Sequence, residues 1–340
     1  MAGWPPITEI AGAVQSGKAK AVDMVDKALS TISATHEFQA IISTTEKYAV
    51  ARAAEIDRRV EKGKKAGRLA GVPFIAKDNF LVFGAPTTAA SNMLKNFQAP
   101  YQATVINRLE AEGAICVAKA NLDAFAHGSS TENSDFFVSK NPHDKTRVPG
   151  GSSGGSAAAV MLDMAPFGLG TDTGGSVRLP ASFVGAVGVK PTYGLVSRSG
   201  VIAMASSTDV IGPIARSTDD AALVLDVIAG RDELDSTTIE RDAEAYTDWD
   251  DTIQNKKAGL IKEYMHEGID EGTRRVVDEA VGKLEKMGVQ VNEVSLPSLS
   301  LALAVYYVVM PAEVASNLAR YDGQRFGYSH DEAKTLDDSY

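Results

Sequence analysis

The sequence has a single cysteine, Cys116, among 340 residues, so no disulfide can form within the chain. Cys116 lies in an apolar run, which predicts a packed residue of a buried strand rather than a nucleophile, and a lone thiol fits the reducing cytoplasm. Histidines are also few. None lies in a GxSxG elbow or at a spacing typical of metal ligands, so we expect no metal in this chain. The five are His36, His127, His143, His266 and His330.

Positive charge and long apolar runs are both scarce. Lysine and arginine number 34 against 44 aspartates and glutamates, a net charge of -10 that disfavours independent binding to nucleic acid. The longest apolar segment, Leu301–Ala312, is shorter than the ~20 residues that a bilayer requires. Residues 1–6 do not begin a secretory signal, because no basic region followed by an apolar stretch is present. We therefore expect no membrane or secretory segment.

The patterning that is present indicates an α/β protein. Apolar residues make up 44% of the chain, which is enough for a large core. Helical periodicity alternates with short buried runs, and glycines follow several helices. The acidic residues 231–251 have little apolar periodicity, and we interpret them as a surface connection rather than a domain linker. The predicted helices are Val22–Ile32, Ala103–Gly113, Asp219–Ala229 and Thr273–Met287, and the predicted strands are Ala114–Ala118, Ala258–Ile261 and Val289–Val294.

A first glycine-serine cluster runs from Pro149 to Ser156 and leads into a strongly helix-forming run of alanines. It predicts a glycine-rich turn that opens a helix. A phosphate-binding loop would need a lysine directly after the last glycine, where Ser156 stands. By itself the cluster is more typical of a flexible loop with serine caps.

A second cluster runs from Gly170 to Arg178 and places two glycines directly before Ser176. Glycines allow a close approach of the backbone and let successive N–H groups point at one spot. This pattern predicts an oxyanion hole for a carbonyl attacked by Ser176. Its donors would be the N–H groups of Thr173, Gly174 and Gly175.

The third element is an apolar strand-like run, residues 71–76, that ends in Lys77. Desolvation lowers the pKa of a lysine, and a neutral amine is a competent general base. A serine nucleophile needs such a base nearby. Alone, such a lysine is more often a solvated charge.

Together, and in this order, the three elements resemble the amidase signature family. The gaps agree as well, with 75 residues from Lys77 to Ser152 and 24 from Ser152 to Ser176, and the likeness is close from Arg68 to Arg216. The resemblance implies a Ser-Ser-Lys triad, in which Ser176 attacks an amide, Ser152 relays the proton of Ser176, and Lys77 accepts a proton from Ser152. A cis peptide bond between Gly151 and Ser152 is implied as well. It also implies a mixed central sheet covered by helices on both faces.

Other segments are similar to one branch of that family, the glutamine-hydrolysing subunits of tRNA-dependent amidotransferases. The resemblance implies that Tyr306, or its neighbour Tyr307, and Ser129 bind glutamine. It also implies two partner subunits, one of which uses ATP and Mg²⁺, contacts the tRNA and receives the ammonia, with no cofactor in this chain. The segments are Asn121–Asn133, Lys140–Asp144 and Tyr306–Tyr328.

Three departures from that branch bear on the prediction. Ala124 stands where a glutamate is usual and His127 where a methionine is usual, and the chain reaches Tyr340 without the C-terminal portion that completes the family's pocket and sheet. A free-standing amidase for another small amide and an inactive scaffold fragment are therefore the alternatives. We expect one domain over 1–340, made of a helical cap (1–64), a catalytic core (68–216) and an incomplete remainder (217–340).

Overall fold

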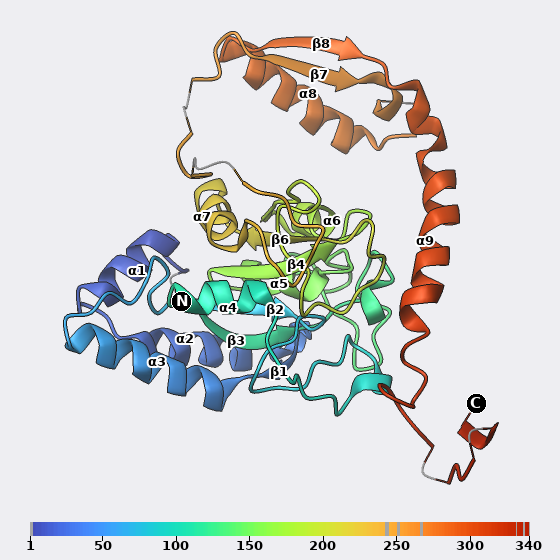
Figure 1. Cartoon of the computed structure of the whole chain (residues 1–340). Helices are drawn as coiled ribbons and strands as arrows, with labels where there is room; N and C mark the ends of the chain where they lie inside the picture. The colour runs from blue at the N-terminus through green and yellow to red at the C-terminus, as the bar shows by residue number, and fades with distance from the viewer. Residues whose placement is uncertain are drawn as a thin grey trace. The chain divides into compact units, whose positions relative to one another are not determined.

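The computed structural model describes residues 3–241, 245–249, 252–265, 268–330, 332–335 and 337–339 (Figure 1). The chain divides into two compact units, one of residues 1–247 and 315–340 and the other of residues 248–314. The expectation of one domain over residues 1–340 remains a prediction. One boundary between the units follows residue 247 and so falls within the acidic residues 231–251, which the sequence did not predict to be a domain linker. His266 and Tyr340 lie outside the described residues.

A six-stranded sheet organises the first unit, in the order β1-β3-β2-β4-β6-β5. The central strand β2 pairs in parallel with both β3 and β4, whereas the β1-β3, β4-β6 and β5-β6 pairs are antiparallel. The predicted mixed α/β sheet is therefore confirmed. The strands are β1 (Ile41–Thr44), β2 (Pro73–Lys77), β3 (Ile115–Ala120), β4 (Phe167–Asp172), β5 (Val187–Gly188) and β6 (Val210–Ala215).

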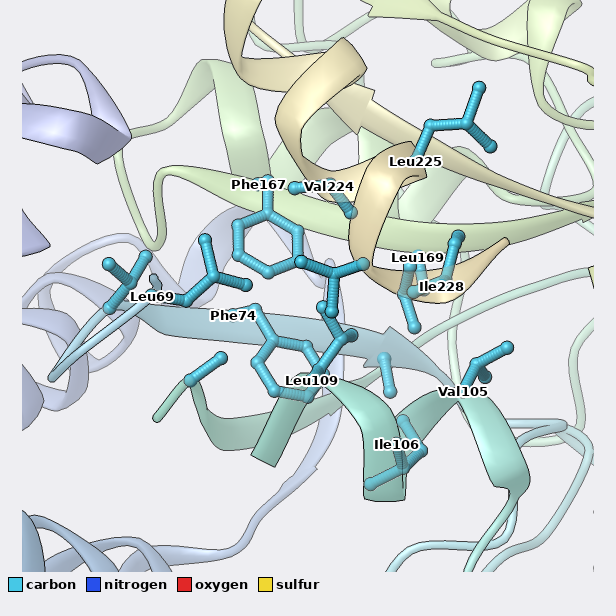
Figure 2. Close-up of a cluster of buried hydrophobic side chains, with 14 of the residues drawn as sticks. Leu69, Phe74, Val105, Ile106, Leu109, Phe167, Leu169, Val224, Leu225 and Ile228 are labelled. Carbon is cyan, nitrogen blue, oxygen red and sulfur yellow. The ribbon is translucent and has the colours of Figure 1, made fainter. Parts of the chain in front are cut away.

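One face of this sheet is covered by α4 (Thr104–Ala111) and α7 (Thr218–Ile228). Figure 2 shows side chains of both helices gathered around Phe74 of β2 and Phe167 of β4. The two rings stack with centroids 5.2 Å apart and planes 9° from parallel. Cys116 of β3 is buried in the same cluster, as predicted, and burial raises the pKa of its thiol to about 12.

Phe74 offers a direct test of this core. Because its side chain is fully buried, Phe74→Ala removes a packed ring and leaves a cavity, so we expect it to lower the free energy of unfolding by about 3–5 kcal/mol. Urea unfolding followed by circular dichroism measures the change. Phe83→Ala is the matched control, since that ring is 40% exposed and should cost much less. Equal losses in the two variants would contradict the packing described.

The opposite face is covered by α2 (Ala21–Ala34), α3 (Glu46–Glu61) and α5 (Gly154–Met161). The first 64 residues are therefore more than a cap, because they include strand β1 and because apolar residues of α1 (Ile7–Gln15), α2 and α3 join the core clusters. Further elements are α6 (Arg178–Val184) and the 3-10 turns His36–Phe38, Asn92–Leu94, Ala124–Ala126, Lys262–Tyr264, Pro297–Leu301 and Asp337–Ser339.

The second unit contains the parallel pair β7 (Lys257–Ile261) and β8 (Gln290–Val294), connected through α8 (Glu271–Lys286). These elements confirm the late strand-helix-strand pattern. Gly288, between α8 and β8, has the left-handed φ of 86° that suits a glycine after a helix.

The helix α9 (Ala302–Leu318) is longer than the apolar segment expected from the sequence. With the preceding 3-10 turn it forms a run of 22 residues, Pro297–Leu318, whose mean hydropathy of 1.6 and length would allow it to cross a membrane. The helix extends beyond the apolar segment Leu301–Ala312 because Pro311 lies inside the helix instead of ending it. Helices that pack against protein can have the same length and apolar composition as helices that cross a membrane.

Candidate active site

Lys77 ends β2 with a fully buried side chain. Side chains alternate along a strand, so Lys77 shares the face of Ile75, which α5 covers. Its Nζ donates to Ser152 Oγ at 2.7 Å and lies 2.9 Å from Thr171 Oγ1. The structure thus brings two of the three predicted triad residues into hydrogen-bond contact.

The charge state of Lys77 follows from its burial. Desolvation lowers the pKa of this lysine from 10.5 to about 7, although the negative charges of Asp123, Asp209 and Asp172 oppose the shift. A substantial fraction of the amine is therefore neutral at neutral pH, and only the neutral form can accept a proton.

Ser152 lies in a turn that packs closely against neighbouring residues, because the glycines at the contacts have no side chains. The Gly151–Ser152 peptide is cis, as the family resemblance implies. A Cβ on Gly151 would lie 2.2 Å from Asp123 Oδ2, and one on Gly170 of β4 would lie 2.7 Å from Ser153 Oγ. Only glycine fits such approaches, so both clusters are needed to bring the start of α5 onto the sheet.

Ser176 lies in the loop between β4 and α6, and it is 8% exposed while Lys77 and Ser152 are fully buried. Its carbonyl oxygen accepts a hydrogen bond from Ser153 N at 3.1 Å. The nucleophile loop is therefore attached through the backbone to the serine pair. Of the three predicted residues, Ser176 is the one that solvent reaches.

Asp172 holds this loop, a role for which sequence analysis gave no expectation. Its buried carboxylate accepts hydrogen bonds from Gly175 N at 2.8 Å, from Val177 N at 3.2 Å and from the Arg178 guanidinium at 2.9 Å. Burial would raise the pKa of Asp172, but the hydrogen bonds and charge of Arg178 outweigh it and lower the pKa. Ser176 is thus bracketed by residues bound to one carboxylate.

This arrangement bears on the predicted oxyanion hole. The N–H of Gly175 is directed at Asp172, so in this structure it is not offered to a substrate. The hydroxyl of Thr173 donates to Asp209 Oδ1 at 2.6 Å, which fixes the start of the same loop. The contribution of the Thr173 and Gly174 N–H groups to an oxyanion hole remains a prediction.

Asp172→Asn is expected to reduce amide hydrolysis by about 100-fold, because a loop displaced by an ångström misplaces the nucleophile. An asparagine side chain keeps the shape but offers its NH₂ group where Gly175 N or Arg178 now donates. Steady-state kcat should fall while the circular dichroism spectrum is retained. Asp144→Asn, at an exposed carboxylate, is the matched control. An unchanged kcat in Asp172→Asn would remove this role.

Two further carboxylates complete the surroundings of Lys77, and both are distant in sequence. Asp123 accepts from Thr131 N at 3.0 Å and Asn133 N at 3.1 Å, and Asp209 accepts from Met204 N at 2.9 Å. Burial raises the pKa of both aspartates. They orient the loops on either side of the triad.

Thr171 also joins the site without having been expected. Its hydroxyl accepts from Asn79 Nδ2 at 3.1 Å as well as contacting Lys77. Thr171 belongs to the second glycine-serine cluster and Asn79 stands two residues after Lys77, but only the fold places them together. Thr171 also lines a cavity of about 210 Å³ together with Ser206, Asp209 and the Arg198–Asp235 ion pair.

That ion pair corrects the interpretation of residues 231–251 as a surface connection. Asp235 is buried. Burial alone would raise the pKa of its carboxyl group, but hydrogen bonding to Arg198 outweighs this effect and lowers the pKa to about 2. Asp232 accepts from Ser197 Oγ at 2.5 Å and from Thr104 Oγ1 at 2.6 Å. Polar contacts thus attach this acidic segment to the core, which apolar periodicity could not indicate. Residues 242–244 and 250–251 lie outside the described part.

Ser129 is exposed, and its carbonyl carbon would lie 2.8 Å from a Cβ on Gly151, so its backbone lies beside the turn of Ser152. His127 is half-buried, and burial lowers the pKa of its imidazole. Its Nε2 is buried and has no hydrogen-bond partner among the described residues. Ser129 as a substrate residue remains a prediction.

Tyr306 lies on α9 in the second unit, so its predicted role in binding glutamine also remains a prediction. Its ring meets that of Tyr307 edge-on, with centroids 5.7 Å apart, and Tyr307 is 66% exposed. The following segment belongs to the first unit. There Asn317 Nδ2 donates to Met204 O at 3.1 Å, next to the turn that Asp209 holds.

The family model described as Amidase matches residues 23–340. The chain is 48% identical over 335 residues to an A-type subunit of the glutamyl-tRNA(Gln) amidotransferase of Clostridium acetobutylicum, covering 98% of this chain and 70% of that protein. It is 49% identical over 320 residues to the A-type subunit of the same enzyme in Geobacillus kaustophilus, covering 94% and 66%.

Solved structures of an amidotransferase subunit and of an amidase also align with this chain. The A-type subunit of the glutamyl-tRNA(Gln) amidotransferase from Thermotoga maritima aligns with a TM-score of 0.79 and 42% identity, covering 87% of this chain and 63% of that one. A peptide amidase from Stenotrophomonas maltophilia aligns with a TM-score of 0.84 and 30% identity, covering 98% and 70%. The chain therefore spans about two thirds of the length of these proteins.

Proposed function

The chain belongs to the amidase family, and from this premise we propose that it hydrolyses glutamine to glutamate and ammonia as one subunit of a tRNA-dependent amidotransferase. The observation that carries the proposal is the 2.7 Å hydrogen bond from Lys77 Nζ to Ser152 Oγ, in a fully buried site next to the loop of Ser176. The relatives named as amidotransferase subunits supply the choice of substrate.

The chemistry follows from the order of these groups. Ser176 Oγ attacks the side-chain carboxamide carbon of glutamine, and its proton passes to Ser152 Oγ while the Ser152 proton passes to neutral Lys77. The relay then returns a proton to the departing nitrogen, so that the C–N bond breaks and ammonia leaves. Water attacks the γ-glutamyl ester through the same relay, which frees glutamate and regenerates Ser176.

Residues around the triad supply binding and charge stabilisation. The N–H groups of Thr173 and Gly174 stabilise the oxyanion, while Asp172 holds Gly175 and the rest of the loop in place. Ser129 contacts glutamine, and the role of Tyr306 in binding glutamine remains a prediction. His127 adjoins this region, where it either alters glutamine access or only fills the volume of the usual methionine, without a role in the chemistry.

The ammonia is consumed by a partner. In the proposed assembly two partner subunits complete a cytoplasmic heterotrimer, one of which uses ATP and Mg²⁺ to activate glutamate on mischarged tRNA(Gln). This chain itself holds no cofactor. Its net charge of -10 supports contact with tRNA mainly through the partner.

A free-standing amidase is the second candidate function. The alignment with the peptide amidase, at a TM-score of 0.84, favours it. In this case the triad acts as above on another small amide, and no partner is needed for turnover.

Co-expression with the two partner subunits distinguishes the candidates. The proposal predicts that the three chains elute together in gel filtration and release ammonia from glutamine, with a higher rate when ATP and glutamyl-tRNA(Gln) are present. Failure to form a complex, combined with hydrolysis of simple amides by the chain alone, would favour the second candidate. Absence of ammonia release from every amide would reject both.

A further inference from the structure

A second fully buried lysine, Lys119, lies beside the strand that carries Lys77. In the register of the parallel pair, Lys77 is opposite Ala120 and Ala76 is opposite Lys119. The register shifts after Phe74, and Val117 and Ala118 both face the α5 side of the sheet. This bulge turns the Lys119 side chain to the face opposite Lys77.

On that face Lys119 meets Asp78, the residue directly after Lys77. Its Nζ lies 2.5 Å from Asp78 Oδ1, and both side chains are fully buried. The remaining ammonium protons point to Thr87 Oγ1 at 3.0 Å and Pro86 O at 3.4 Å. The other carboxylate oxygen accepts from Thr88 N at 2.9 Å and from the Thr88 hydroxyl. The pair is therefore closed, with its charges and hydrogen bonds satisfied.

The same residues connect β2 to the loops around the site. Asp78 N donates to Ala120 O at 3.0 Å, which joins the ends of β2 and β3. Asp78 O accepts from Ala89 N at 3.0 Å, and Ala89 O accepts from Phe125 N at 2.9 Å. Phe125 follows Asp123, whose carboxylate holds the loop of Ser129. The ion pair is thus the buried anchor of this connection.

We propose that the Asp78–Lys119 ion pair is a positioning device for Lys77, which fixes the end of β2 and cancels the charge of the second lysine so that it does not act on the first. The inference rests on the proposed role of Lys77 as the base. Neither side chain touches the reacting atoms, so both residues act through Lys77. The charged groups that act on Lys77 are then Asp123, Asp172 and Asp209, together with the pair Asp78 and Lys119 across the sheet.

Removing one partner at a time gives shifts of opposite sign. Asp78→Asn leaves an uncompensated cation and should lower the pKa of Lys77, whereas Lys119→Met leaves an anion and should raise it. Across the sheet we expect each shift to be about half a pH unit. The double variant Asp78→Asn/Lys119→Met carries neither charge and should titrate as the wild type does. A purely structural role would not produce opposite signs.

Nuclear magnetic resonance of the full chain labelled with ¹³Cε-lysine measures the Lys77 titration directly, with its signal assigned from Lys77→Arg. The NMR measurement of the Lys77 pKa needs no turnover. If the wild type releases no ammonia, the proposed function is contradicted, but the pKa shifts of the variants still decide whether the ion pair positions Lys77. Shifts of the same sign in both single variants, no shift in either, or a double variant displaced as far as a single one would overturn it.

Stability provides the second reading if a single variant folds poorly. Breaking one half of a buried pair leaves an unpaired charge, so each single variant should unfold at a lower urea concentration than the double variant. Lys119→Arg keeps the charge and should keep the wild-type titration of Lys77. The pairing would be contradicted if the double variant lost as much free energy of unfolding as the two single variants lose together. It would also be contradicted if Lys119→Arg displaced the titration of Lys77.

Discussion

Ser176→Ala is expected to lower kcat for ammonia release from glutamine on the order of 10⁶-fold, the scale found when a serine nucleophile is removed. The loss is large because Ser152 and Lys77 have no proton to relay once the attacking hydroxyl is absent. Glutamine binding should change little, since the side chain is small and 8% exposed. Ammonia release by the reconstituted complex, together with calorimetric binding of glutamine, measures both quantities.

Ser16→Ala is the matched control for this variant, because Ser16 is exposed and its hydroxyl donates to carbonyls of its own helix end. It should retain full activity. A Ser176→Ala variant that still releases ammonia at the wild-type rate would reject the nucleophile assignment, and with it the mechanism.

Lys77→Met is expected to reduce kcat by about 10²–10⁴-fold, the usual contribution of a general base. In the wild type, kcat/KM should fall on the acidic side of pH about 7, with the slope of a single proton, and level off above it. The sign follows from the chemistry: protonated lysine cannot accept a proton, so activity needs the neutral form, whose share rises with pH. An ordinary lysine pKa of 10.5 would place this limb more than three units higher.

The pH profile of the complex on glutamine, fitted for one ionisation, measures this midpoint. Lys62→Met, at an exposed lysine, should keep both rate and midpoint. A wild-type profile that is flat from pH 6 to 9, or a Lys77→Met variant with an unchanged profile, would exclude Lys77 as the base.

Short motifs allowed much of the centre of the site to be anticipated. Lys77, Ser152 and Ser176 stand in three segments whose glycines and apolar runs indicate tight turns beside a buried strand. Helix and strand patterns such as Val22–Ile32 and Thr273–Met287 likewise correspond to α2 and α8. In each case the sequence pattern spans only a few residues, and the backbone freedom of glycine or the periodicity of apolar residues determines the local structure there.

Features that depend on distant contacts could not be anticipated in this way. The hydrogen bonds of Asp123 and Asp209 are set by loops that the fold brings together, and nothing local distinguishes them from other aspartates. The register shift near Val117 places Lys119 against Asp78. Such a bulge is decided by pairing across strands. For the same reason the acidic segment around Asp235, without apolar periodicity, suggested a surface connection rather than its buried ion pair.

Trapping the covalent intermediate tests the central claim most directly. The complex is mixed with glutamine, quenched in acid during turnover, digested and mapped by mass spectrometry. The account predicts that the peptide carrying Ser176 gains one γ-glutamyl group, and that the gain disappears in Ser176→Ala. A glutamyl group on Cys116 or any other residue, or continued turnover with no adduct on Ser176, would contradict it.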